Sequence, residues 1–121
     1  MKLSLIVTGG AMRIAELLTL ARLAEGAGFA GMYMAEVHRS AFVPLTAIAS
    51  VTQRMRIGPY VLNAYGRSPL LTGMSAIDLN EFSGGRLVLG LGSGNRVINE
   101  VWQGIPHTRV LTKMTEYVEI V

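Results

Sequence analysis

The 121-residue sequence contains no cysteine. This absence excludes disulfide bonds, thiolate metal ligands and cysteine nucleophiles, and it suits a protein of the reducing cytoplasm. We therefore predict a cytoplasmic protein without a metal site.

Long apolar runs are also absent. Arginine, glutamate or glycine interrupts every stretch before it reaches the ~20 residues of a membrane-spanning helix. Residues 1–13 lack the basic segment and long apolar segment of a secretory signal. Arginine supplies nine of the 11 basic residues, but these are spread along the chain rather than clustered among aromatics, as nucleic-acid binding would require. The sequence predicts neither a membrane nor a nucleic-acid partner.

Charge is scarce as well. Charged residues make up 16% of the chain, below the roughly 25% of ordinary soluble domains. Hydrophobic residues make up 50%, and the mean hydropathy is +0.41. The length suits one domain, but this composition gives more apolar surface than a small domain can bury. We expect that surface to be covered by a missing part of the domain or by a second copy in a homo-oligomer.

What the chain does contain is one repeated unit. Short apolar runs begin near residues 3, 29, 57 and 87, and each of the first three is followed by a stretch with helical spacing of apolar residues. The predicted strands are Leu3–Val7, Phe29–Met34, Ile57–Leu62 and Leu87–Leu91. Helices are expected after Gly10, near Pro44, from Ser68-Pro69 with the Ser68 hydroxyl as cap, and from about Thr108. This alternation indicates an α/β fold with a parallel sheet.

Two architectures share this alternation, an open doubly wound sheet and a (β/α)8 TIM barrel. A barrel needs roughly 250 residues, so only its first four β/α units would be present here. The apolar excess and the helical end of the chain favour this second architecture. We therefore predict that residues 1–121 form a single partial domain, the amino-terminal half of a barrel.

Chemistry in either architecture gathers at the carboxyl ends of the strands. The segments that follow the predicted strands are 8–10, 36–39, 63–67 and 93–99. In the second segment, Glu36 and His38 can form an acid/base pair, because a carboxylate orients a neighbouring imidazole. The alternative is a solvated loop histidine. His107, just before the last helix, is more simply a polar residue at a helix end.

The other two segments are suited to binding. Arg67 can hold a phosphate or carboxylate through a forked pair, or it can be a surface arginine. Gly90, Gly92 and Gly94 follow the fourth strand, where bare backbone can approach an anionic or planar ligand. Their spacing does not match G-x-G-x-x-G, so they can equally mark a bend at a strand end.

Three segments of the chain, in order, carry a family resemblance: Gly28-Phe-Ala-Gly-Met-Tyr-Met-Ala-Glu36, Arg56-Ile-Gly-Pro-Tyr-Val-Leu-Asn-Ala-Tyr-Gly-Arg-Ser-Pro69 and Leu79-Asn-Glu-Phe-Ser-Gly-Gly-Arg-Leu-Val-Leu-Gly-Leu-Gly-Ser-Gly94. Together they resemble the bacterial luciferase-like superfamily. Among its branches, the chain is most similar to the coenzyme F420-dependent oxidoreductases, including the methylenetetrahydromethanopterin reductase group. The resemblance implies the amino-terminal half of a luciferase-like (β/α)8 barrel.

The resemblance also implies a site. A deazaflavin, or alternatively FMN, would lie over the carboxyl ends of the strands and exchange a hydride with a small substrate. A non-prolyl cis peptide and bulge at Tyr60-Val61 would support the ring, with Asn63, Ser93, Gly94 and Asn95 as further cofactor contacts. Glu36 is the expected catalytic acid, and His38 is second. Val37 stands where luciferases and sugar-phosphate dehydrogenases have histidine, and Asn95 where those dehydrogenases have glutamate, so these particular activities are disfavoured.

Three functions remain open at this point. The first is an F420-dependent hydride-transferring oxidoreductase, with an FMN-dependent luciferase-like monooxygenase as its variant. The second is a half barrel that binds no cofactor and only self-associates. The third is a small Rossmann-type nucleotide or S-adenosylmethionine binder, which an ordered helix beginning at Arg96 would support and a barrel-like curvature of the strands would disfavour.

Overall fold

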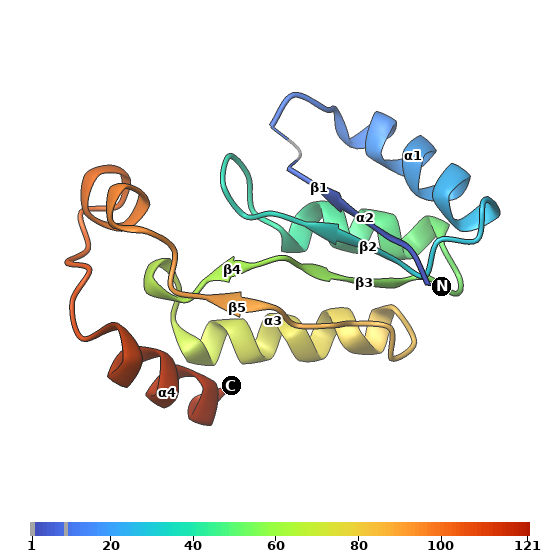
Figure 1. Ribbon diagram of the computed structural model, residues 1–121. Helices are drawn as coiled ribbons and strands as arrows, with labels where there is room; N and C mark the ends of the chain where they lie inside the picture. The colour runs from blue at the N-terminus through green and yellow to red at the C-terminus, as the bar shows by residue number, and fades with distance from the viewer. Residues whose placement is uncertain (1, 9) are drawn as a thin grey trace.

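The computed structural model describes residues 2–8 and 10–121 (Figure 1). Gly9, inside the segment 8–10 expected at the end of the first strand, lies outside the described residues. Three parallel strands, β1 (Ser4–Val7), β2 (Gly31–Met34) and β3 (Arg56–Pro59), form a sheet in the order of the chain. Val7, Met34 and Pro59 stand in register at the same edge. The carboxyl ends of the first three strands therefore meet, as expected.

The predicted third and fourth strands are each more broken than the sequence suggested. The third divides into β3 and β4 (Leu62–Asn63), and a cis peptide bond joins Tyr60 and Val61 between them. Only β5 (Leu91–Gly92) and a bridge from Ile57 to Leu87 remain of the fourth. Ile57 pairs with Leu87, and Leu62 pairs with Leu91. Between these two pairs the third strand advances by five residues and the fourth by four. This extra residue is a bulge. Both features expected at Tyr60-Val61 are present.

Glycine allows the two broken strands to lie close together. A Cβ on Gly58 would come within 1.8 Å of the Val88 carbonyl oxygen, and one on Gly90 within 2.5 Å of the Pro59 carbonyl oxygen. Side chains at these positions would push the fourth strand off the third, because real Cβ atoms do not approach backbone so closely. The glycines therefore permit the close pairing of two strands whose ladder is interrupted by the bulge.

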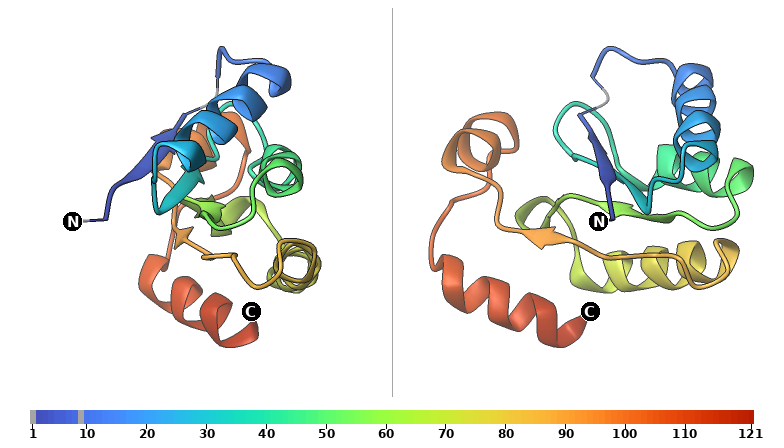
Figure 2. Two further views of the ribbon diagram at one scale, coloured as in Figure 1. Left: turned by 90° about the vertical axis from the view of Figure 1, so that its right-hand side faces the viewer. Right: turned by 45° about the vertical axis from the view of Figure 1, so that its right-hand side comes forward.

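Helices α1 (Ile14–Gly26), α2 (Phe42–Val51) and α3 (Pro69–Phe82) form an outer layer along one face of the strands (Figure 2). Leu17, Ala21 and Ala24 recur at helical spacing on α1, and all three are buried. They join Leu45, Ile48 and Ala49 of α2 and Met32, Met34 and Ile57 of the strands in one core. Ile6 points to the other face of the strands, opposite to Leu5 and Val7, and is 55% exposed.

The third helix begins where predicted, but only some of its apolar residues are buried. Pro69 is its first residue, yet the Ser68 hydroxyl makes no capping hydrogen bond, so the expected cap is wrong. Thr72, Ala76 and Leu79 are buried, while Leu70, Met74 and Ile77 are more than half exposed. The apolar residues here ring the whole helix, so the sequence period alone could not identify the packed side.

The last helix, α4 (Val110–Ile120), starts two residues after the expected position. It packs against α3, and Tyr117 is its only buried residue; Val118, and Val121 just after the helix, are 57% and 39% exposed. Before it, a short π-helical turn, η2 (Val97–Trp102), follows the glycine-rich loop, where the sequence showed no helical pattern. Within the described residues no helix is long and apolar enough to span a membrane.

The order of the strands distinguishes between the expected architectures. A doubly wound sheet reverses its strand order at a switch point, whereas a barrel adds each strand beside the previous one. Here β1, β2, β3 and the strand that contains β5 are consecutive neighbours. An ordered helical segment does begin at Arg96, as the Rossmann-type binder would have, but it is only the six-residue turn η2 and does not continue into a helix that covers the sheet. The arrangement is that of successive β/α units and favours the barrel type over the Rossmann-type binder.

Candidate functional site

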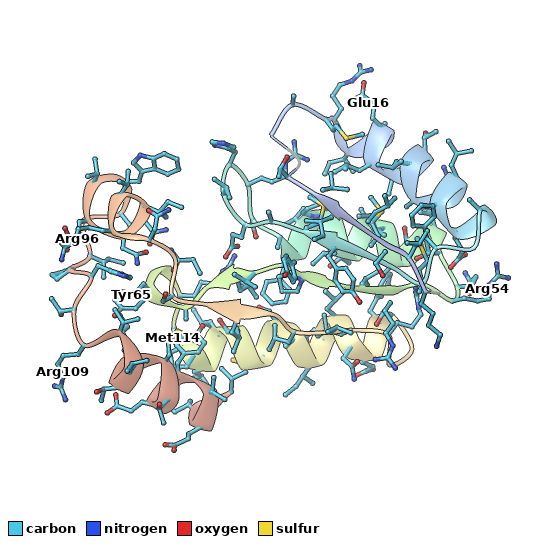
Figure 3. The ribbon with its side chains drawn as sticks, viewed as in Figure 1. Glu16, Arg54, Tyr65, Arg96, Arg109 and Met114 are labelled. Atoms are coloured by element: carbon cyan, nitrogen blue, oxygen red, sulfur yellow. The ribbon has the colours of Figure 1, made fainter. Side chains whose placement is uncertain are left out.

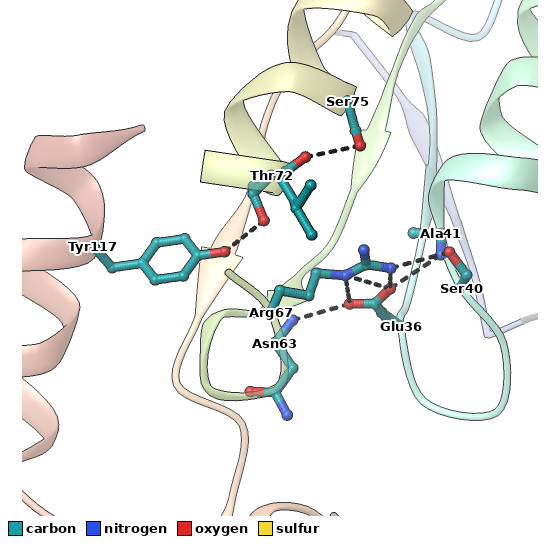
Figure 4. A network of polar contacts seen from close by, with 9 residues as sticks. Glu36, Ser40, Ala41, Asn63, Arg67, Thr72, Ser75 and Tyr117 are labelled. Carbon is teal, nitrogen blue, oxygen red and sulfur yellow. Dashed lines mark hydrogen bonds and ion pairs between the residues drawn. The ribbon is translucent and has the colours of Figure 1, made fainter. Parts of the chain in front are cut away.

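Glu36 lies two residues beyond the end of β2 and is paired with Arg67. The guanidinium donates from Nε to both carboxylate oxygens at 3.2 and 3.1 Å, and from Nη2 as well (Figure 4). Backbone N–H groups of Ala41 and Asn63, each at 3.3 Å, also donate to the carboxylate. The hydrogen bonds to Glu36 raise the pKa of Arg67 despite its partial burial. Glu36 thus ties the ends of two strands together.

The expected acid/base pairing of Glu36 with His38 is wrong. Strand β2 ends at Met34, so residues 36 and 38 do not share a strand face, and among the described residues no hydrogen bond joins their side chains. The imidazole of His38 instead lies 6.0 Å from the indole of Trp102, centroid to centroid, at 35°. The expected fork of Arg67 is present, but it holds a carboxylate of the protein itself.

These side chains line a cleft of about 480 Å³ at the carboxyl ends of the strands. Glu36 and Arg67 lie on it with Asn63, while His38 and Trp102 reach it from the loop after β2 and from η2. Three of the expected strand-end segments therefore contribute to one site. The remaining expected cofactor contacts are not in the lining of this cleft: Tyr60, Val61, Ser93, Gly94 and Asn95.

A buried amide network supports the neighbouring strand ends. The Oδ1 atom of Asn63 accepts from the backbone N–H of Tyr65 at 3.1 Å, so its Nδ2 is the atom that donates to Oδ1 of Asn99 at 2.8 Å. The Nδ2 of Asn99 then donates to the Ser93 carbonyl oxygen at 2.8 Å. Backbone groups at both ends fix which way each amide points.

The same network assigns the tautomer of His107. Asn99 Nδ2 lies 2.7 Å from His107 Nδ1 and can only donate, so Nδ1 accepts and the ring proton is on Nε2. The imidazole packs on Tyr65 with centroids 4.8 Å apart, and the Tyr65 hydroxyl donates to the Thr108 carbonyl at 2.6 Å. Tyr65 lies between η2 and α4 (Figure 3). His107 thus belongs to this network rather than to the end of a helix.

The glycine-rich loop packs against this network. Gly94 has φ +66°, and a Cβ there would lie 2.8 Å from Asn63 Oδ1 and 2.9 Å from Asn99 Oδ1. Asn95 Oδ1 accepts from the backbone N–H of Ile98 at 2.9 Å and so starts the turn η2. The glycine at 94 is required by its conformation and by a close approach at once.

Sequence reasoning missed the two residues that organise this region. Asn99 is completely buried, although it falls inside the expected segment 93–99 and nothing in its spacing marks it. Trp102, the only tryptophan, is 55% exposed beside the cleft. Both depend on the π-helical turn, which turns Asn99 inward and carries Trp102 to the cleft. The presence of a single tryptophan was the one signal available in the sequence.

Comparison with known proteins agrees with this architecture. The family model described as luciferase-like monooxygenase matches residues 2–121. The chain is 38% identical over 112 residues to 5,10-methylenetetrahydromethanopterin reductase of Archaeoglobus fulgidus, covering 91% of this chain and 33% of that relative. The chain belongs to the luciferase-like monooxygenase family, which confirms the resemblance expected from the sequence. It spans about a third of the length of the curated relatives it matches.

Solved structures show the same fold. The coenzyme F420-dependent tetrahydromethanopterin reductase of Methanopyrus kandleri superposes with a TM-score of 0.79 at 26% identity, covering 87% of this chain and 30% of that one. The oxygenating constituent of 3,6-diketocamphane monooxygenase of Pseudomonas putida, in complex with FMN, gives 0.86 at 18% identity, covering 99% and 38%. The second likeness concerns the fold alone.

Proposed function

We propose that the protein to which this chain belongs is an oxidoreductase that transfers a hydride between coenzyme F420 and a small organic substrate. The observation that carries the proposal is the 38% identity, over 91% of the chain, to a methylenetetrahydromethanopterin reductase. The cleft at the carboxyl ends of the strands supports the proposal as a place where a substrate can bind, and the Tyr60-Val61 bulge lies at the end of the third strand. A cytoplasmic homo-oligomer remains a prediction.

The residues beside the cleft fit a planar cofactor. The side chains of Tyr60 and Val61, at the bulge, are 57% and 38% exposed. They offer an apolar support for a flat ring, with the backbone N–H groups of Ser93 and Gly94 and the Nδ2 of Asn95 as the proposed contacts for its polar edge, since the Ser93 and Gly94 carbonyls and Asn95 Oδ1 already accept hydrogen bonds. An F420 deazaflavin, when bound, supplies the hydride chemistry, and the protein supplies orientation and electrostatics.

The described side chains have distinct roles in this proposal. The side chain of Asn63 is hydrogen-bonded to Asn99 and Tyr65, so its proposed role is to hold the end of β4 in place beside the ring. Glu36 is bound to Arg67, and it acts by fixing that guanidinium in the cleft. His38 is exposed in the lining of the cleft, and it is the proposed acid/base group of the site.

Parallel titrations of the full-length protein with F420 and FMN test this proposal. We expect F420 binding at micromolar concentration, seen as a change in deazaflavin absorbance and fluorescence. FMN binding in place of F420 would favour the luciferase-like monooxygenase that the description of the family suggests. Binding of neither cofactor, in a sample that light scattering shows to be a defined oligomer, would refute the oxidoreductase and support a self-associating protein.

A further inference from the structure

The ion pair with Glu36 leaves one nitrogen of Arg67 unused. Nε donates to Glu36, and Nη2 donates to Glu36 and, at 3.1 Å, to the Ser40 hydroxyl (Figure 4). Within residues 2–8 and 10–121, no group accepts from Nη1, and this atom is not shut off from solvent. Arg67 lines the cleft, so its Nη1 presents two N–H groups whose direction the carboxylate has already fixed.

A donor held in this way suits an oxygen acceptor on a ligand. The guanidinium cannot swing toward the ligand or away from it without breaking its bonds to Glu36. Little conformational entropy is then lost when an oxygen binds, which is the usual benefit of a positioned arginine. A carboxylate or ring carbonyl oxygen is the group that this geometry recognises.

The mouth of the same cleft is aromatic. The rings of His38 and Trp102 come from separate elements, the loop after β2 and the turn η2, and both side chains are exposed. An indole that lies in water beside a cleft offers a large flat surface for stacking. The volume of about 480 Å³ accommodates one small ring system between this surface and Arg67.

We infer that this cleft binds the substrate of the proposed oxidoreductase, and that the substrate carries a planar ring with a carboxylate or carbonyl oxygen. The ring packs against Trp102 and His38, and the oxygen accepts from Nη1 of Arg67. The cleft is lined by Asn63, one of the expected cofactor contacts, but not by Tyr60 or Val61, so we assign it to the substrate. The inference rests on the proposed function.

The test uses two carboxylates of equal charge and similar size, benzoate and cyclohexanecarboxylate, with the full-length protein. The binding of each carboxylate is measured by saturation-transfer NMR, with and without saturating F420. The fluorescence of Trp102 is followed in the same titrations as a second reporter of binding. We expect benzoate to bind at least about threefold more tightly, because only its ring stacks. F420 should leave benzoate binding intact.

Variants of the cleft make the test specific. Trp102→Leu should weaken benzoate binding about threefold to tenfold, and Trp102→Phe should restore part of it. Arg67→Met should weaken both carboxylates about tenfold or more. The matched controls are Val101→Ala on the same turn and Arg96→Met, which removes an exposed arginine outside the cleft lining; neither should change the affinity.

Each remaining outcome decides the inference. Equal affinity for the two carboxylates, unaffected by Trp102→Leu, would refute the planar ring. Competition between benzoate and F420 would assign the cleft to the cofactor and overturn the substrate site. No benzoate binding in a protein that binds F420 would overturn this inference but leave the proposed function standing, whereas failure of F420 binding would remove the proposed function itself. The selectivity measured on the unmodified protein does not depend on whether any variant folds.

Discussion

Replacing Asn99 tests the amide network most directly. Its side chain is fully buried, accepts from Asn63, and donates to the Ser93 carbonyl and to His107. Asn99→Ala leaves the buried Nδ2 of Asn63 without an acceptor, which costs about 1–3 kcal/mol. The Ser93 carbonyl and His107 are only part-buried, so water can replace part of their loss. We expect a total destabilisation of about 3 kcal/mol.

Asn99→Asp separates the donor role from the acceptor role. The new carboxylate still accepts from Asn63, but it now faces the Ser93 carbonyl and the acceptor Nδ1 of His107 with an oxygen. Because neither donor is replaced, Asn99→Asp should also lose about 1–3 kcal/mol of stability.

Urea unfolding followed by circular dichroism measures both variants. Asn80→Ala is the matched control, since Asn80 is exposed on α3, and it should stay within about 0.5 kcal/mol of the parent. If Asn99→Ala were as stable as Asn80→Ala, the amides would not form the buried network described above. If Asn99→Asp were as stable as the parent, the assignment of Nδ1 of His107 as acceptor would be wrong.

Three further predictions use the same unfolding assay. Gly94→Ala should cost at least about 1 kcal/mol more than Gly84→Ala, because both positions have positive φ but only Gly94 lacks room for a Cβ; equal costs would contradict the close approach. Arg86→Lys should cost about 2 kcal/mol, since the guanidinium donates to three backbone carbonyls and to the Thr52 hydroxyl, and lysine cannot span them; a loss below 0.5 kcal/mol would argue against this role. Partial burial acts to raise the pKa of Glu25, but hydrogen bonds from three backbone N–H groups and the charge of Arg54 outweigh it and lower that pKa. The stabilisation by the Glu25 carboxylate is therefore present above the ordinary carboxyl pKa of 4.5 and is lost as the pH falls through the lowered value. Glu25→Gln should accordingly be less stable at neutral pH and lose less on acidification, and an unchanged acid profile would refute the assignment.

The predictions that succeeded from sequence depend on local rules. Strand and helix positions follow from the period of apolar residues, and the helix start at Pro69 appears where predicted. The family and the cis peptide at Tyr60-Val61 followed from a resemblance that extends over nearly the whole chain. In each case the deciding residues are close to one another in the sequence.

The predictions that failed concern partners distant in the sequence. The sequence left Arg67 open between holding a phosphate or carboxylate and lying free on the surface, and it paired Glu36 with His38, whereas Arg67 and Glu36, 31 positions apart, bind each other. Spacing within a segment can say that charged residues lie at a strand end, but it cannot say which of them pair, because pairing depends on how neighbouring loops meet. The importance of Asn99 was invisible for the same reason.

The sequence by itself determined the alternation of strand and helix, the excess of apolar surface, and the edge of the sheet at which polar residues gather. These follow from the spacing and composition of residues, which act locally. Only the tertiary structure decided which side of α3 is buried, which carboxylate holds Arg67, and that His38 and Trp102 share one cleft. The reason is physical: these outcomes depend on contacts between segments that meet only when the parallel strands lie side by side.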